Sequence, residues 1–188
     1  AVVDVSSDFR FDSGWVYGLP ERNRQSIAGT RRVSNPGCYA TAVQIGLLPL
    51  LDQMQPACCP VAFGVSGYSG AGRTPSERND PVRLRDNLLP YALTGHAHEC
   101  EVRHQLGRDV RFVPHVAPFF RGLSITFSVV LRSPDTPESL LERFGDFYSR
   151  APLTVVTREI PEIASVRDRN GCRVGGFVVE KADPRRLT

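Results

Sequence analysis

Several features that would mark other protein classes are missing from this 188-residue sequence. No apolar run approaches the roughly 20 residues that span a bilayer, and the first residues lack the basic-then-apolar pattern of a secretory signal. Lysine is almost absent, with Lys181 the only one, and the arginines are scattered along the chain. With a net charge of only +3, this pattern argues against a nucleic-acid surface or a membrane partner.

Paired cysteines are also missing. The five cysteines form neither C-x-x-C zinc pairs nor the dense set of a disulfide-stapled secreted domain. We therefore predict a reducing compartment, no metal site, and at most one cysteine with a special role. The sequence also has no G-x-G-x-x-G after a first strand, so we predict that a dinucleotide-binding unit is absent.

What remains suits one soluble domain, residues 1–188, of mixed α/β (α+β) class. Apolar residues at helical spacing predict a helix that starts after Gly37 and is kinked by Pro49. Further helices are expected at 98–106 and from Pro137 onward. The expected extended segments are 1–5, 15–21, 30–33, 60–66, 110–116, 123–131, 153–157 and 174–181. Short turns between neighbouring strands predict a mixed, largely antiparallel sheet with helices packed on it.

Cys38 is the cysteine best placed for chemistry. It follows Asn35-Pro36-Gly37, where a helix is expected to begin at the cysteine itself. Free backbone N–H groups and the positive end of the helix dipole then face the sulfur, which should lower the thiol pKa and favour the thiolate. The alternative is a buried structural cysteine, which is the usual role of a lone one.

A thiolate nucleophile needs a partner that handles protons, and four histidines are available. His98 and Glu101 are three residues apart at the start of a helix, so they share a face and the carboxylate can orient the imidazole. His96 lies just before that helix and should point elsewhere. His104 fits the helix surface, and His115 fits a strand in the core.

Two segments are candidates for binding anions. Residues 66–73 (SGYSGAGR) form a loop of small residues, including Ser69 and Gly70, in which backbone amides can approach an anion closely. The loop lacks the ending of a Walker motif. Arg121 is the second candidate, and an ordinary surface arginine is its alternative reading.

Six blocks of the sequence together resemble the N-acetyl-γ-glutamyl-phosphate reductases of arginine biosynthesis, and they occur in that family's order. The blocks are 3–10 (VDVSSDFR), 17–21 (YGLPE), 35–41 (NPGCYAT), 64–72 (GVSGYSGAG), 95–101 (GHAHECE) and 114–122 (PHVAPFFRG). The NPGCYAT block distinguishes this family from the related aspartate-semialdehyde and glyceraldehyde-phosphate dehydrogenases.

The resemblance implies a reaction. Cys38 would attack the acyl phosphate of N-acetyl-γ-glutamyl phosphate, and NADPH would reduce the resulting thioester to N-acetylglutamate γ-semialdehyde. His98 would act as acid and base with Glu101 orienting it, and His96 is the substitute. Arg10, His96 and Arg121 would bind substrate, and Ser69 and Gly70 would lie near the nicotinamide.

The resemblance also implies a fold like the catalytic domain of glyceraldehyde-3-phosphate dehydrogenases, with a homo-oligomer formed through the sheet. Family members carry a separate NADP-binding Rossmann domain, so we expect this chain alone not to transfer hydride. The compartment would be the cytoplasm, or the mitochondrion if the chain is fungal. Two other readings stay open: a stand-alone cysteine acyltransferase or hydrolase, and a non-catalytic dimerisation module.

Overall fold

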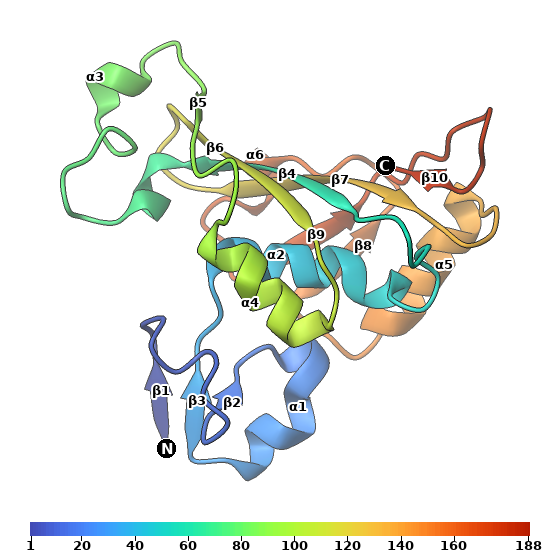
Figure 1. Ribbon diagram of the computed structural model, residues 1–188, viewed down its shortest axis with the longest axis horizontal. Coiled ribbons are helices and arrows are strands. Elements are labelled where there is room, and N and C mark those ends of the chain that lie inside the picture. Colours follow the sequence, from blue (N-terminus) through green and yellow to red (C-terminus); the bar gives the residue numbers. More distant parts are fainter.

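A five-stranded sheet forms the centre of the molecule (Figure 1). This computed structural model describes residues 1–188. The strands lie in the order β10 (Arg186–Leu187), β7 (Leu123–Val130), β4 (Val61–Gly67), β6 (Arg111–Ala117) and β5 (Leu89–Pro90). Only the β4–β6 pair is parallel, and the other three pairs are antiparallel. The mixed, largely antiparallel sheet predicted from the sequence is therefore confirmed.

Two smaller sheets are parallel throughout, which the sequence did not predict. Near the N-terminus, β3 (Arg32–Ser34) lies between β1 (Val2–Asp4) and β2 (Val16–Tyr17). Near the other end of the chain, β8 (Thr154–Thr157) pairs with β9 (Cys172–Gly175). The N-terminal sheet and its helix α1 (Pro20–Gly29) form a separate lobe at the bottom of Figure 1.

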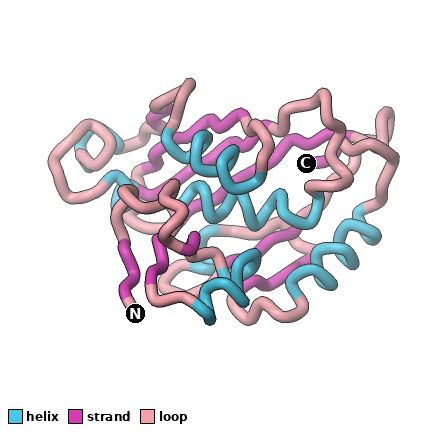
Figure 2. Tube along the Cα trace, turned by 60° about the horizontal axis from the view of Figure 1, so that its bottom comes forward, coloured by secondary structure: helices cyan, strands magenta, loops and turns pink.

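Helices α2 (Cys38–Leu47) and α4 (Ala97–Leu106) lie side by side against one face of the main sheet (Figures 1 and 2). The Tyr39 and Phe112 rings, 4.7 Å apart, join this layer to β6. Gly64 of β4 lies beneath them, and a Cβ there would come within 2.7 Å of both rings. That glycine lets α2 sit close on the sheet.

The predicted helices begin where expected. Helix α2 starts at Cys38 and gives way at Pro49 to a 3₁₀ turn, η1 (Leu48–Leu50). Helix α5 (Pro137–Tyr148) is capped by Thr136, whose hydroxyl accepts from the Ser139 N–H. From the helical spacing of its apolar residues, Phe147 would also be expected to face inward, but it is 46% exposed. The buried stripe of α5 runs through Leu140, Phe144 and Tyr148 instead.

Two segments differ from the sequence-based expectation. Residues 15–21 are extended only at Val16–Tyr17, and the helix α1 that follows was not expected. It buries no residue, so it has no apolar stripe, and only the proline at its first position marks it. The strand expected at 174–181 ends at Gly175, because Gly176 adopts a φ of +69°.

The second face of the main sheet carries Val61 and Phe63 of β4, which stay 39% and 40% exposed. The Phe63 ring stacks at 4.5 Å on His115 of β6, so His115 lies on this face and not in the core. Two short helices complete the chain: α3 (Pro81–Leu84) and α6 (Ile163–Val166). Every helix in the structure is too short or too polar to cross a lipid bilayer.

Candidate active site

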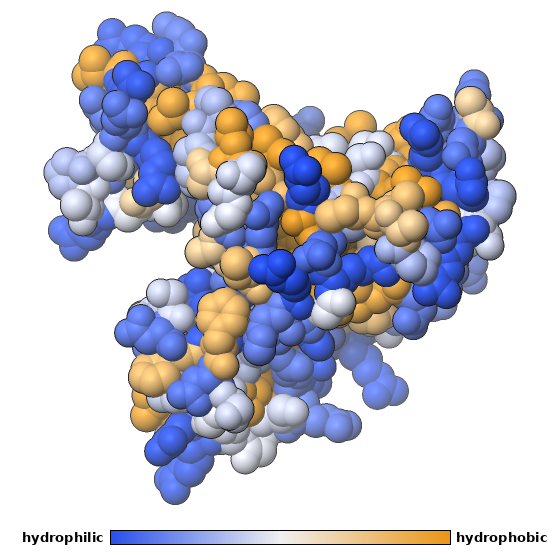
Figure 3. Space-filling model, viewed as in Figure 1, coloured by the Kyte–Doolittle hydropathy of each residue, from blue (hydrophilic) through white to orange (hydrophobic).

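The N-terminal ends of α2 and α4 meet beside the hollow that separates the N-terminal lobe from the α3 lobe (Figures 1 and 3). Gly37 is the N-cap of α2, and its side-chain-free backbone leaves the first N–H groups of the helix uncapped. Thr41 donates to the Gly37 carbonyl from both its N–H, at 2.8 Å, and its hydroxyl, at 3.0 Å. Cys38 therefore begins a well-formed first turn with an exposed, unpaired thiol.

His98 of α4 lies directly against the residue before Cys38. A Cβ at Gly37 would collide with Nε2 of His98, so only glycine leaves room for the ring. Nδ1 of the same ring is buried and has no hydrogen-bond partner. The ring is thus positioned by packing, with Nε2 as the nitrogen nearest the Cys38 turn.

Glu101 does not orient His98, contrary to the sequence-based expectation. Its carboxylate is 2% exposed and accepts three hydrogen bonds: from the Tyr17 hydroxyl at 2.7 Å, the Gly37 N–H at 2.8 Å and Arg10 at 3.1 Å. A buried carboxylate requires such partners. Glu101 therefore holds the peptide that leads into Cys38, and its carboxylate accepts no hydrogen bond from His98.

The network extends to two residues that the sequence analysis missed. The fully buried Gln44 amide donates to the Tyr17 hydroxyl at 2.7 Å and to the Ala40 carbonyl at 3.0 Å. Tyr17 lies on β2 in the N-terminal lobe, whereas Gln44 lies on α2. Tyr17 opens one of the six family blocks, but neither its block nor the position of Gln44 in the sequence indicates a contact with Glu101.

Arg10, expected to bind substrate, is largely committed to this network. Its Nε donates to the Asn35 carbonyl at 3.0 Å, and its Nη1 pairs with Glu101. Its side chain is only 13% exposed. Arg10 thus fastens the turn that precedes Cys38 while keeping its positive charge close to the thiol.

His96 does not point elsewhere but belongs to the same cluster. Its Nδ1 accepts from the His98 N–H at 3.1 Å and so caps α4. Its ring lies 4.8 Å from that of His98, 5.6 Å from Tyr91 and 5.1 Å from Phe112. The two histidines and Tyr91 form a continuous row of rings, which we call the ring row.

The pKa of the Cys38 thiol is raised, whereas its place at a helix start led us to expect a lowered one. Although Cys38 is accessible to solvent, the atoms packed around its thiol displace part of the hydration of the thiolate and so raise the pKa of Cys38. The N–H groups of Tyr39 and Cys38 and the charge of Arg10 oppose this rise. Burial and the neighbouring His96 lower the pKa of His98 to about 4. At neutral pH the pair is therefore a thiol beside a neutral imidazole, which suits proton transfer at the moment of attack rather than a preformed thiolate.

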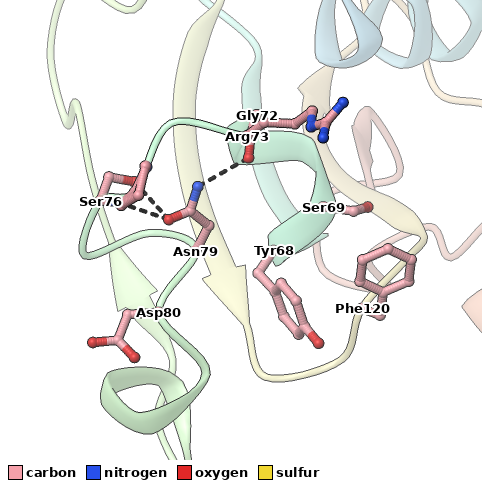
Figure 4. A pocket seen from close by; sticks show the side chains of 9 residues that line it. Tyr68, Ser69, Gly72, Arg73, Ser76, Asn79, Asp80 and Phe120 are labelled. Carbon is pink, nitrogen blue, oxygen red and sulfur yellow. Dashed lines mark hydrogen bonds between the residues drawn. The ribbon is translucent and has the colours of Figure 1, made fainter.

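The glycine-rich loop forms a separate hollow of about 530 Å³ (Figure 4). Ser69 lines it within η2 (Tyr68–Ala71), together with Arg73. The Tyr68 and Phe120 rings also line it and pack edge to face, with their centroids 5.4 Å apart. Gly70 lies in the same turn, and a Cβ built on it would lie 3.9 Å from the Ser66 hydroxyl oxygen. Arg121 is on the surface, paired with Asp168 at 3.0 Å.

Neither a metal nor a dinucleotide has a complete site among these residues. No group of three histidine, cysteine or carboxylate side chains is placed to hold a metal ion. The parallel β1–β3–β2 sheet lacks a glycine-rich turn, and its helix α1 begins at Pro20, whose nitrogen has no hydrogen to donate to a phosphate. The residues present do not fit a whole dinucleotide.

Comparison with known proteins identifies the family to which this chain belongs. The profile of the family described as "Semialdehyde dehydrogenase, dimerisation domain" matches residues 38–188, so the match begins at Cys38 itself. The chain belongs to this family.

Solved structures of semialdehyde dehydrogenases share the fold. An aspartate semialdehyde dehydrogenase II from Vibrio cholerae, complexed with ASA, has a TM-score of 0.72 at 18% identity and covers 99% of this chain and 64% of its own. A probable aspartate-semialdehyde dehydrogenase from Pseudomonas aeruginosa has a TM-score of 0.73 at 17% identity, with coverages of 100% and 65%.

Curated relatives of this semialdehyde dehydrogenase domain are more similar in sequence. The N-acetyl-gamma-glutamyl-phosphate reductase of Xanthomonas oryzae pv. oryzae is 50% identical over 98% of this chain and 58% of its own length. The protein of that name from Stenotrophomonas maltophilia is 51% identical over 95% and 56%. The "Bifunctional protein argC, mitochondrial" of Dictyostelium discoideum is 48% identical over 95% and 21%. This chain thus spans about 58% of the length of the Xanthomonas relative.

Proposed function

We propose that this chain is the acyl-transferring domain of an N-acetyl-γ-glutamyl-phosphate reductase. The observation that carries the proposal is Cys38 at the start of α2, with His98 packed on the adjacent Gly37. Identity of 50% to the Xanthomonas reductase, over 98% of this chain, supports this substrate class.

In this proposal Cys38 is the nucleophile and His98 the general base. As the sulfur attacks the acyl carbon, the thiol proton passes to His98, whose ring is neutral at neutral pH. Its pKa of about 4 makes the free ring a weak base, so the proton moves as the sulfur–carbon bond forms and the thiol becomes more acidic. The bond from the acyl carbon to the phosphate oxygen then breaks. The proton returns from His98 to the departing phosphate, leaving a thioester on Cys38 and a neutral imidazole.

The rest of the site prepares this step. Glu101 and Arg10 hold the Asn35–Gly37 turn, so the sulfur and the first N–H groups of α2 keep one geometry. We propose that these N–H groups, which have no side-chain cap, stabilise the carbonyl oxygen as it gains negative charge during attack. Because this scaffold is set before substrate arrives, little reorganisation is needed during the reaction.

Reduction of the thioester requires a hydride, which we propose comes from NADPH. The hydride donor has no complete binding site within residues 1–188, so we assign this chain only the acyl-transfer half of the reaction. We propose the cytoplasm as its compartment by similarity to the bacterial relatives, and the name of the Dictyostelium relative indicates mitochondria for a eukaryotic form.

We also propose a homo-oligomer built through the second face of the main sheet. Val61 and Phe63 are exposed in the middle of this face, and Val113 lies opposite Phe63 on β6. Serine and threonine side chains of β7 border this apolar centre. An apolar centre with a polar rim is the usual composition of a protein interface.

Phosphate release tests the assignment. Mixing the chain with N-acetyl-γ-glutamyl phosphate, without NADPH, should give a burst of about one phosphate per chain as Cys38 becomes acylated. The matched mass increase should map to the Cys38 peptide. Cys38→Ala should abolish the burst, and Cys100→Ala, which removes another exposed cysteine, should retain it.

Other outcomes have definite meanings. Sustained phosphate release without NADPH would replace the proposal by a hydrolase that uses the same cysteine. No burst in the unaltered chain would leave a dimerisation module as the function of this domain.

A further inference from the structure

The loop between η2 and α3 has a fixed shape. Asn79 accepts from the Ser76 N–H at 2.7 Å, and its amide donates to the carbonyls of Gly72 at 2.9 Å and Thr74 at 2.8 Å (Figure 4). A single side chain therefore fastens three points of the loop. Arg78, the residue before Asn79, starts from an anchored backbone position.

The Arg78 guanidinium stacks on the far end of the ring row. Its Cζ lies 5.0 Å from the centroid of Tyr91, a distance typical of a cation–π contact. From Tyr91 the row passes through His96 to His98 at centroid spacings of 5.6 and 4.8 Å, and His98 reaches Gly37. The positive charge of Arg78 thus lies at the Tyr91 end of the ring row, and Tyr91 is within electrostatic range of Cys38.

Charge effects on Tyr91 agree with this placement. Burial raises the pKa of Tyr91, the charge of Cys38 raises it further, and Arg78 lowers it. Arg78 is also among the groups that lower the pKa of His96. Tyr91 is therefore within electrostatic range of both the Cys38 sulfur and the Arg78 guanidinium.

The neighbouring arginines are engaged otherwise. Arg10 pairs with Glu101, Arg121 with Asp168, and Arg83 with Glu77. Arg73 lines the separate hollow beside Tyr68. Arg78 has no carboxylate within ion-pair distance, so it is the cation of the ring row that is free to meet an anionic ligand.

We infer that Arg78 binds an anionic oxygen group, the phosphate of an acyl phosphate, on the molecule that Cys38 attacks. This inference rests on the proposed function. Arginine suits the task because its planar guanidinium can donate two parallel hydrogen bonds to a phosphate while its face stays on the Tyr91 ring. Arg78 would thereby favour acyl phosphates over neutral acyl donors.

Two alkylating reagents of similar size test the inference on the 188-residue chain. Iodoacetate is anionic and iodoacetamide is neutral, and peptide mass mapping gives the rate of each at Cys38. In Arg78→Gln the iodoacetate-to-iodoacetamide rate ratio should fall about threefold to tenfold, because a nearby positive charge is lost. The iodoacetamide rate should fall less than the iodoacetate rate, because iodoacetamide carries no charge for Arg78 to attract.

Arg83→Gln is the matched control, since it removes an equal charge from an exposed arginine of the same lobe. Its ratio should equal that of the unaltered chain, and Arg78→Lys should recover most of the lost ratio. Inorganic phosphate should slow the alkylation of Cys38 in the unaltered chain and not in Arg78→Gln. An unchanged ratio in Arg78→Gln, or an equal fall in Arg83→Gln, would overturn the inference.

The phosphate-burst experiment keeps the two proposals apart. A normal burst with an unchanged alkylation ratio would remove the role of Arg78 and leave that of Cys38. A lowered ratio without any burst would remove the reductase assignment and leave Arg78 as an anion-attracting residue beside an unacylated cysteine.

Discussion

The two ends of α2 are held by opposite kinds of interaction. At the Cys38 end, Glu101 accepts hydrogen bonds from Tyr17, Gly37 and Arg10, all within a buried polar network. At the Leu47 end the contacts are apolar: Leu47 is fully buried and Leu50 is 2% exposed.

The difference indicates what each end is for. Apolar packing stabilises a fold at little risk, whereas a buried carboxylate is costly unless every partner is in place. Of the two ends of α2, only the one that carries the candidate nucleophile is held by a buried polar network that costs stability. Damage at the Cys38 end should therefore alter thiol chemistry, and equal damage at the Leu47 end should not.

Removing Glu101 should have the largest effect. Glu101→Ala leaves Tyr17, the Gly37 N–H and Arg10 without their shared acceptor, and the free energy of unfolding should fall by about 3–5 kcal/mol. The pH profile of Cys38 alkylation should also change, since the turn before the thiol is released. Urea unfolding and peptide-resolved alkylation measure the two effects.

Leu47→Ala is the counterpart at the other end, with an expected loss of about 2–5 kcal/mol from the cavity it leaves. In the folded variant the pH profile of Cys38 alkylation should match that of the unaltered chain. A shifted profile in Leu47→Ala would break the distinction between the two ends.

His98 should make stability depend on pH. Its pKa is about 4 in the folded chain and about 6.5 when unfolded, so the unfolded chain binds a proton first as pH falls. From pH 7 to pH 5 this residue should remove about 1–2 kcal/mol from the free energy of unfolding. The stability is fully present above pH 6.5 and lost toward pH 4.

Urea unfolding at both pH values, compared between the unaltered chain and His98→Asn, isolates this contribution from those of other groups. The difference in stability between pH 7 and pH 5 should be smaller in the variant. An identical pH dependence in both would mean that His98 is not buried as a neutral ring.

Two buried tyrosines give the smallest and sharpest comparison. The Tyr17 hydroxyl donates to Glu101 at the Cys38 end, and the Tyr148 hydroxyl donates to the Ile45 carbonyl at 2.5 Å near the other end. Tyr148→Phe should cost about 1 kcal/mol, since one hydrogen bond is lost. Tyr17→Phe should cost more, since its hydroxyl both donates to Glu101 and accepts from Gln44. Only Tyr17→Phe should shift the alkylation profile of Cys38, so equal profiles in both variants would contradict the positioning role.

The sequence predicted where the site lies better than it predicted the hydrogen bonds within the site. The Pro36-Gly37-Cys38 turn correctly located the start of α2, because proline and glycine act locally on the backbone. Glu101 was expected to serve His98 because they share a helix face, yet tertiary contacts direct its carboxylate to Gly37. Spacing within one helix cannot reveal a partner on another element.

The same limit applies to the fold. The apolar stripes of α2 and α5 predicted those helices, whereas α1 has no buried residue and left no stripe. The lowered thiol pKa expected at a helix start is outweighed by burial, a tertiary effect that the sequence around Cys38 does not contain.

The anchors of the Cys38 turn also have a consequence for how the chain folds. Arg10 and Tyr17 are 91 and 84 residues away from Glu101 along the sequence, and Gly37 is 64 residues away. Closing such long loops costs entropy before any contact repays it, so these bonds form only when distant parts of the chain have met. A nascent or partly folded chain therefore carries Cys38 without its anchor, and the environment of this thiol reports on the completion of folding.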